Sequence, residues 1–179
     1  TPGKLYASGG RYTAKDNGTD AKFTVTSFGN HAYGAVIVEG VDNFIVADSI
    51  KVLNYGALSG SAYENSNSSI VTLLGINCLD LTNVTTLGKQ ACRGAKMTEL
   101  KAPSAAVFGM EAFLNCTALT KAYLPAFKTS DSDTFENCGE LIEVTLGENA
   151  EKLGSSMFVG AKNLQKITIL SHKKVELGG

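Results

Sequence analysis

Residues 108–125 read FGMEAFLNCTALTKAYLP, and this stretch contains both landmarks from which the fold can be predicted. The first landmark is an apolar residue, Gly, two variable residues, a small residue and an aromatic one, here running from Phe108 to Phe113. The second is apolar-x-x-apolar-x-apolar, here running from Leu119 to Leu124. The alternation at the end of the second landmark predicts a β-strand whose apolar side chains face inward.

The second landmark recurs along the chain with a nearly constant step. Its six copies begin at Val41, Ile76, Met97, Leu119, Leu141 and Leu164. From the second copy onward the steps are 21, 22, 22 and 23 residues, whereas the first step is 35 residues. The first landmark recurs in phase with it, at Phe28, Leu53 (with Asn in place of Gly), Leu87, Phe108 and Leu153. The long first step predicts an insertion near residues 62–75, a range that includes a polar run.

A period of about 22 residues predicts a solenoid, because one such unit cannot bury its own apolar edge and must stack on the next. Equivalent strands then align as a parallel sheet along one side. The recurring Gly predicts a turn where a side chain would obstruct the chain or where φ is positive. The spans between strands are too short for long helices, so we expect one-turn or 3₁₀ segments around residues 89–92, 110–113 and 155–158.

These residues resemble the leucine-rich repeats of the BspA-like type, whose pattern reads IGxxAFxxCxxLxxIxxP. The likeness covers roughly residues 28–170, with departures at Cys92, Ala95, Ala161 and the copy around Asp131. The resemblance implies an α/β solenoid, a right-handed leucine-rich repeat superhelix with one parallel sheet. Short 3₁₀ or one-turn helices and irregular turns would lie on its convex side. It also implies a secreted or cell-surface protein of a bacterium or a protist, with a role in adhesion or ligand binding.

Residues 1–24 lie outside the repeat and predict a strand-rich N-terminal cap. Strands are expected at residues 4–7, 11–14 and 22–27, with a hairpin turn at 16–18. Residues 25–179 then form an array of about six repeats. Residues 171–179 either form a C-terminal cap or belong to a longer native array.

Composition argues against several classes of function. The 179 residues include 16 Lys and Arg and 17 Asp and Glu, so the net charge of −1 offers no basic surface for a nucleic acid or an anionic membrane. No apolar run approaches the roughly 20 residues of a membrane helix. No CxxC pair, GxSxG, HExxH or phosphate-binding loop is present. The sequence therefore predicts no enzyme, no cofactor, no metal and no membrane insertion of this segment.

Cys116 and Cys138 occupy equivalent positions of neighbouring repeats and should stack in the core. A Cα separation of ~4.8 Å would permit a disulfide. Parallel Cα–Cβ vectors, however, keep the Cβ atoms farther apart than the usual ~3.8 Å. Reduced cysteines acting as small apolar residues are therefore the favoured interpretation.

The outward positions of the predicted strands form two columns. The first contains Asn43, Cys78, Glu99, Lys121, Glu143 and Lys166, and the second contains Ile45, Asp80, Lys101, Tyr123, Thr145 and Thr168. Leucine-rich repeats generally use this concave face for partners, so the candidate contact residues are Ile45, Asp80, Glu99, Lys101, Lys121, Tyr123, Glu143, Thr145, Lys166 and Thr168. Tyr123 ranks first as the only aromatic residue of either column. In the alternative interpretation, the alternating Glu and Lys side chains of the first column pair with one another and contact no partner.

Two functional hypotheses follow. The first is an extracellular or cell-surface module that binds a protein, such as a host matrix protein, or a glycan through the concave face, and we expect it to be a monomer. The second is a structural spacer within a longer surface protein, with no ligand of its own. An enzyme ranks third, because only the insertion near residues 62–75 could build a deep pocket.

Overall fold

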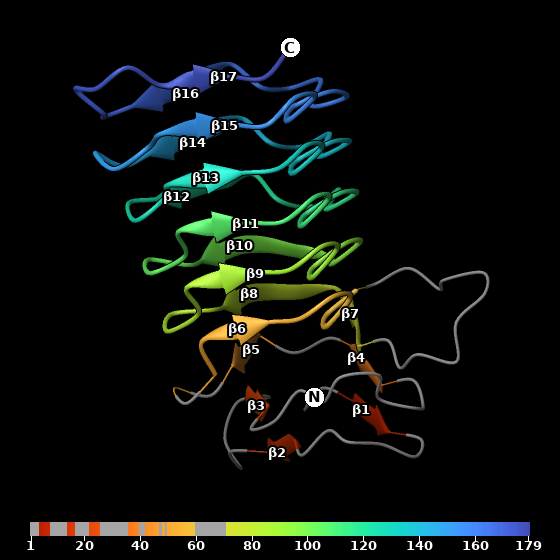
Figure 1. Ribbon diagram of the computed structural model, residues 1–179. Helices are drawn as coiled ribbons and strands as arrows, with labels where there is room; N and C mark the ends of the chain where they lie inside the picture. Colours follow the sequence, from red (N-terminus) through yellow and green to blue (C-terminus); the bar gives the residue numbers. More distant parts are fainter. Residues whose placement is uncertain are drawn as a thin grey trace.

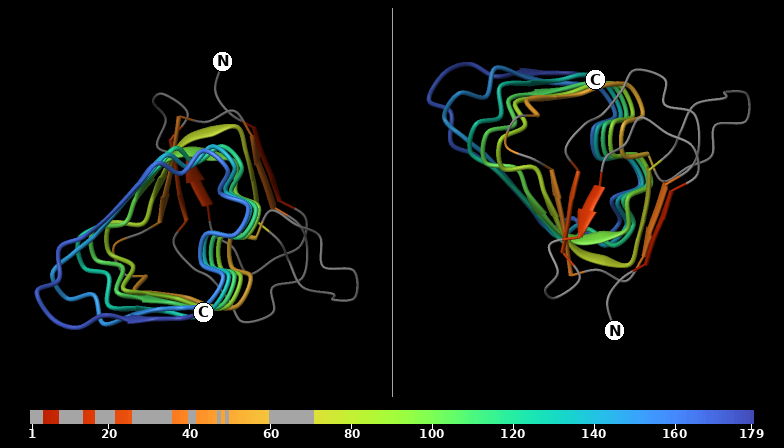
Figure 2. Two further views of the ribbon diagram at one scale, coloured as in Figure 1. Left: turned by 90° about the horizontal axis from the view of Figure 1, so that it is seen from above. Right: turned by 90° about the horizontal axis from the view of Figure 1, so that it is seen from below.

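The computed structural model describes residues 4–7, 14–16, 22–25, 36–39, 42–46, 48, 50–59 and 71–179. The described residues form a stack of coils without a helix (Figure 1). Viewed along the stack, successive coils lie nearly over one another (Figure 2). The predicted solenoid is therefore confirmed, but it is a β-solenoid, and the α/β class predicted from the sequence is wrong.

The largest sheet has eight strands and contains the predicted strand of every repeat. Its order is β16 (Lys166–Ile169), β14 (Glu143–Leu146), β12 (Lys121–Leu124), β10 (Met97–Lys101), β8 (Ile76–Asp80), β5 (Asn43–Val46), β3 (Lys22–Val25) and β2 (Ala14–Asp16). All neighbours are parallel except β2 and β3, which are antiparallel. Leu79, Leu100, Ala122 and Val144 face the core at equivalent positions.

A second parallel sheet, which the sequence did not predict, lies on the other side of the core. Its order is β17 (Glu176–Leu177), β15 (Lys152–Leu153), β13 (Thr129–Ser130), β11 (Val107–Phe108), β9 (Thr86–Leu87) and β6 (Val52–Leu53). The prediction of one parallel sheet is thus wrong. Each of these strands has only two residues, which is too short for an alternating pattern to be recognised.

A third sheet combines residues near the N-terminus with part of the predicted insertion. β1 (Lys4–Ala7) pairs antiparallel with β4 (Val36–Glu39), which pairs parallel with β7 (Val71–Leu74). The strand predicted at 4–7 is confirmed, whereas the one predicted at 11–14 is β2, which starts at Ala14. Residues 17–18 of the predicted hairpin turn, residues 60–70 of the insertion and the landmark at Phe28 lie outside the described residues. The division at residue 24 stays a prediction.

The core between the two main sheets contains an aromatic ladder. Phe113 stacks on Phe135 with ring centroids 5.3 Å apart, and Phe135 stacks on Phe158 at 6.0 Å. Phe108 packs against Phe127 at 5.4 Å. The predicted recurrence of an aromatic residue therefore becomes a column of rings on three successive coils, which bury each other's apolar surface, while Cys92 takes this position in the coil before them.

The segments predicted as one-turn helices are turns instead. Residues 89–92, 110–113 and 155–158 contain Gln90, Glu111 and Ser156, whose φ angles are 56°, 58° and 55°. A residue with positive φ interrupts a right-handed helix. A second left-handed residue follows four positions later in each coil, at Gly94, Asn115, Asn137 and Gly160. Gly and Asn adopt this conformation readily, so this position carried a sequence signal that the repeat pattern did not use.

Backbone hydrogen bonds to the next coil hold these turns in place. The N–H groups of Gln90, Cys92 and Gly94 donate to the carbonyls of Met110, Ala112 and Leu114, at 2.8, 2.8 and 2.7 Å. The following coils repeat the scheme, with donors Glu111, Phe113 and Asn115 and then Asp133, Phe135 and Asn137. Three columns of head-to-tail peptide groups therefore run along the stack, as three such columns run along an α-helix.

The recurring glycine is required by close packing between coils. A Cβ added to Gly154 would lie 2.0 Å from the carbonyl oxygen of Asp131, and one added to Gly109 would lie 2.6 Å from the nitrogen of Lys89. Neither glycine has a positive φ. The sequence offered two reasons for this glycine, a positive φ angle or a lack of space for a side chain. The lack of space is the reason at Gly109 and Gly154.

Gly154→Ala should lower the free energy of unfolding by about 1–3 kcal/mol, because the added methyl group must push two backbones apart. Gly139→Ala is the matched control, since a Cβ there meets nothing within 4 Å. Urea unfolding followed by circular dichroism measures both variants. Equal midpoints for Gly154→Ala and the wild type would contradict the packing argument.

Candidate functional site

The outer face of the eight-stranded sheet presents the first predicted column in the predicted order. Glu99 pairs with Lys121, Lys121 with Glu143 and Glu143 with Lys166 as Cα partners on neighbouring strands. Asn43 and Cys78 continue this column on β5 and β8. The repeat alignment therefore predicted the register of the face correctly.

The second predicted column lies beside the first. Ile45, Asp80 and Lys101 are successive Cα partners on β5, β8 and β10. Tyr123, Thr145 and Thr168 are successive partners on β12, β14 and β16. Tyr123 is 62% exposed, while Ile45, Asp80, Thr145 and Thr168 are half-buried. The exposed phenol is the most accessible apolar group of the face.

Opposite charges on this face pair with one another. Lys101 Nζ lies 3.3 Å from Asp80 Oδ2. Glu143 lies between two lysines, with its carboxylate oxygens 3.5 Å from Lys166 Nζ and 3.9 Å from Lys121 Nζ. These partly exposed pairs are worth under about 1 kcal/mol each. Among the described residues Glu99 has no salt bridge, so the column is only partly neutralised.

Cys78 was predicted to face outward on this sheet, but it is 7% exposed and therefore buried. Its thiol is short, and the flanking outward residues Asp80, Glu99 and Lys101 have longer side chains. Burial, with smaller contributions from the Glu99 and Asp80 charges, raises the pKa of Cys78 to about 11. Cys78 is consequently a neutral filler of the face rather than a reactive or contacting group.

The other three cysteines lie in the core. All four cysteines are free and buried, which agrees with the interpretation of Cys116 and Cys138 as small apolar residues. Cys116 Sγ donates to the Cys92 carbonyl, and Cys138 Sγ donates to the Phe113 carbonyl, both at 3.2 Å. Burial raises the pKa values of Cys92 and Cys116 well above the ordinary value. The Cys116 thiol is therefore held as a neutral hydrogen-bond donor.

A polar cluster between two turns was not predicted. Gln90, which is 2% exposed, donates through Nε2 to Glu111 Oε2, and Arg93 Nη1 lies 3.4 Å from the same oxygen. Gln90 Oε1 and Arg93 Nε are buried without a partner among the described residues. Glu111 is 21 residues from Gln90 and 18 from Arg93, so only the stacking of neighbouring repeats could have placed it beside them.

Metal and membrane sites are not found within the described part of the chain. No group of three or more His, Cys, Asp and Glu side chains is placed to hold a metal ion there. Nor does that part contain a helix of the length and hydropathy needed to cross a bilayer.

The coil geometry and the repeat pattern agree with a known family. The family model for the BspA type leucine-rich repeat region matches residues 61–176 with six copies, which is more than half of the chain. The chain belongs to the BspA-type leucine-rich repeat family. Proteins of this type are typically surface proteins. The matched family is a repeat module rather than an enzyme family, and leucine-rich repeats in general bind proteins.

A solved structure has the same leucine-rich repeat fold. The crystal structure of the leucine-rich repeat protein of T. pallidum is similar with a TM-score of 0.56 and 18% sequence identity. The likeness covers 80% of this chain and 78% of that one. No curated protein matches the chain by sequence.

None of the four thiols should react with an aromatic disulfide reagent at pH 8 in the native chain. Each is buried, and the raised pKa values of Cys78, Cys92 and Cys116 keep these thiols protonated. All four should react in urea. Absorbance of the released thiolate measures the count, and rapid native labelling would contradict the buried positions.

The free energy of unfolding should fall as the pH rises above about 9. The folded chain keeps the Cys78 proton up to about pH 11, whereas the unfolded chain releases it near the ordinary value of 9.0. The contribution of the protonated Cys78 thiol to the free energy of unfolding is therefore fully present below pH 9 and is lost as the pH rises through 11. Urea unfolding at several pH values measures the fall, which should be smaller in Cys78→Ala. An identical pH dependence in both chains would contradict it.

Proposed function

We propose that the chain is an extracellular or cell-surface module that binds a protein or a glycan through the outer face of its eight-stranded sheet. The observation that carries the proposal is the exposed Tyr123, which lies among Lys101, Lys121 and Thr145 on a sheet whose spacing the coils impose. A large amphipathic ring on a rigid surface contributes contact area at little cost in conformational entropy.

The contact surface would consist of ten of the twelve outward residues of β5, β8, β10, β12, β14 and β16. They are Ile45, Asp80, Glu99, Lys101, Lys121, Tyr123, Glu143, Thr145, Lys166 and Thr168. Glu99 and Tyr123 have no competing salt bridge and would contribute most. Lys101, Lys121, Glu143 and Lys166 would first have to exchange an existing ion pair for a contact with the partner.

The alternative is a spacer with no ligand of its own. The pairing of Asp80 with Lys101 and of Glu143 with two lysines favours it, because a face that neutralises itself attracts partners weakly. A spacer would need only the stacking of the coils, and every residue of the face could then change without a loss of function.

Tyr123→Ala combined with Lys121→Ala should weaken binding by about tenfold or more, as expected when an anchor residue is removed from an interface. The measurement is a screen of the purified chain against host matrix proteins and glycans, followed by titration of each hit. Lys152→Ala, at an exposed position of the six-stranded sheet, is the matched control. A hit that binds the double variant unchanged would contradict this site, and a screen without hits would favour the spacer.

A further inference from the structure

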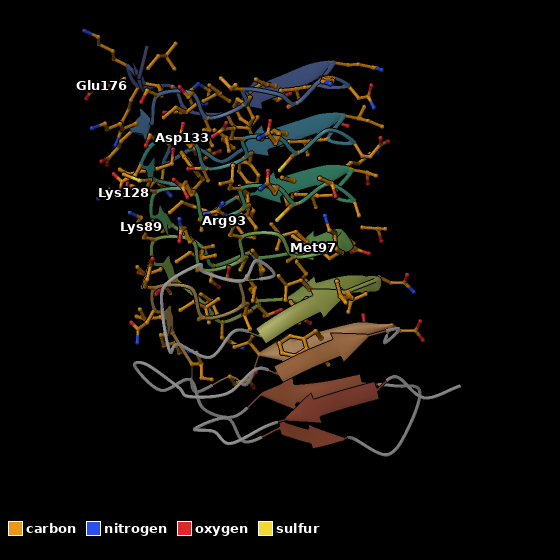
Figure 3. The ribbon with its side chains drawn as sticks, turned by 90° about the vertical axis from the view of Figure 1, so that its right-hand side faces the viewer. Lys89, Arg93, Met97, Lys128, Asp133 and Glu176 are labelled. Atoms are coloured by element: carbon orange, nitrogen blue, oxygen red, sulfur yellow. The ribbon has the colours of Figure 1, made fainter. Side chains whose placement is uncertain are left out.

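The outer side of the six-stranded sheet carries exposed apolar side chains on the first and third of its coils. Val52 is 48% exposed, Tyr55 50%, Val107 40% and Met110 36%. These are four of the ten large apolar side chains that are exposed among the described residues. This face lies on the opposite side of the stack from the eight-stranded sheet (Figure 3). None of the contact residues predicted from the sequence lies on this face.

The exposed apolar side chains form a regular grid. Val52, Thr86 and Val107 are successive Cα partners on β6, β9 and β11, so the two valines lie about 10 Å apart with a threonine between them. Tyr55 and Met110 lie three residues farther along their coils, on either side of Lys89 in the middle coil. Gly56 N–H donates to the Lys89 carbonyl and Gln90 N–H to the Met110 carbonyl, which holds this second row in line.

The grid ends where charged side chains take the same positions. The residues that follow Val107 along the sheet are Thr129, Lys152 and Glu176. Beside them Lys128 Nζ lies 3.6 Å from Glu151 Oε1. Lys89, Lys128 and Glu176 follow one another along this side in Figure 3. The apolar area is thus confined to three coils.

The charges beside the grid are lysines without carboxylate partners. Lys51 and Lys89 are exposed and form no salt bridge with any described residue. The neighbouring carboxylates are engaged elsewhere, since Asp48 accepts from Asn83 and Glu111 binds Gln90 and Arg93. We call the six residues Lys51, Val52, Tyr55, Lys89, Val107 and Met110 the apolar–lysine patch.

We propose that the apolar–lysine patch docks an extended peptide segment of a partner protein in which apolar side chains alternate with acidic ones. Apolar side chains would cover Val52, Val107 and Met110, and carboxylates would pair with Lys51 and Lys89. About four extended residues, at about 3.3 Å each, span the three coils. This inference is independent of the proposed site around Tyr123.

Charge decides among the occupants. A second copy placed patch against patch would bring its lysines against Lys51 and Lys89, which costs rather than gains energy. An anionic membrane surface is recognised by clusters of about four to eight basic residues, and this patch has two. A segment that supplies carboxylates together with apolar side chains satisfies both features of the patch.

The test uses the full chain and a fluorescein-labelled octapeptide of alternating Ile and Glu, titrated by fluorescence anisotropy. Two further octapeptides carry Lys in place of Glu or Ser in place of Ile. We expect the acidic–apolar peptide to bind at least about tenfold more tightly than either. We also expect its binding to weaken as the salt concentration rises.

Lys51→Glu combined with Lys89→Glu should reverse the preference, so that the Lys-containing peptide binds better than the Glu-containing one. Val107→Ser should weaken the binding of the Lys-containing and the Glu-containing peptide alike by about tenfold. It removes exposed apolar area without changing the core. Lys152→Glu changes another exposed lysine, on β15 of the six-stranded sheet; it is the control and should change binding little. Tyr123→Ala with Lys121→Ala should change nothing, which separates this surface from the proposed site.

Three results would overturn the proposal. One is no binding of the acidic–apolar peptide up to about 1 mM, the weakest affinity a specific contact of this size would show. Another is a loss of affinity for the acidic–apolar peptide in Lys152→Glu that is as large as the loss in the patch variants. The third is binding of the chain to vesicles of anionic lipid that Lys51→Glu with Lys89→Glu abolishes, which would assign the patch to a membrane.

Discussion

The stacking of the described coils depends on backbone hydrogen bonds between successive coils. The two main sheets supply them on opposite sides, and the turn donors such as Gln90, Cys92 and Gly94 supply a third set. Because each N–H group in these columns meets a carbonyl of the next coil, no coil can shift along its neighbour without breaking many bonds at once. The aromatic ladder and the recurring glycine packing follow from that fixed alignment.

The same alignment turns sequence spacing into surface geometry. Residues about 22 positions apart become neighbours about 4.8 Å apart, so each face of the stack is a grid whose chemistry can be compared coil by coil. One face presents alternating charges with Tyr123 standing out among them. The opposite face changes from apolar around Val107 to charged around Lys152. The two faces can therefore meet partners of different chemistry on one rigid support.

The incorrect prediction of one-turn helices has a physical cause in the next coil. Gln90 and Glu111 adopt a left-handed conformation that their side chains do not favour, and hydrogen bonds to the next coil compensate for it. One-turn helices were predicted at residues 89–92 and 110–113 because the spans between strands are too short for longer ones. Ser130 is similar: it is buried where other coils have Leu or Phe, and its hydroxyl accepts a hydrogen bond from Gly154 N–H. Neither feature has a local signal.

The solenoid, the strand of each repeat, the register of the outward columns and the stacking of Cys116 with Cys138 could all be predicted from the amino-acid sequence. These properties depend on periodicity, and periodicity is visible in a single chain. Only the tertiary structure decided the second sheet, the burial of Cys78 and the meeting of Gln90 with Glu111. Those depend on what the neighbouring coil places opposite each residue, because a two-residue strand or a left-handed turn is stable only when the next coil completes its hydrogen bonds.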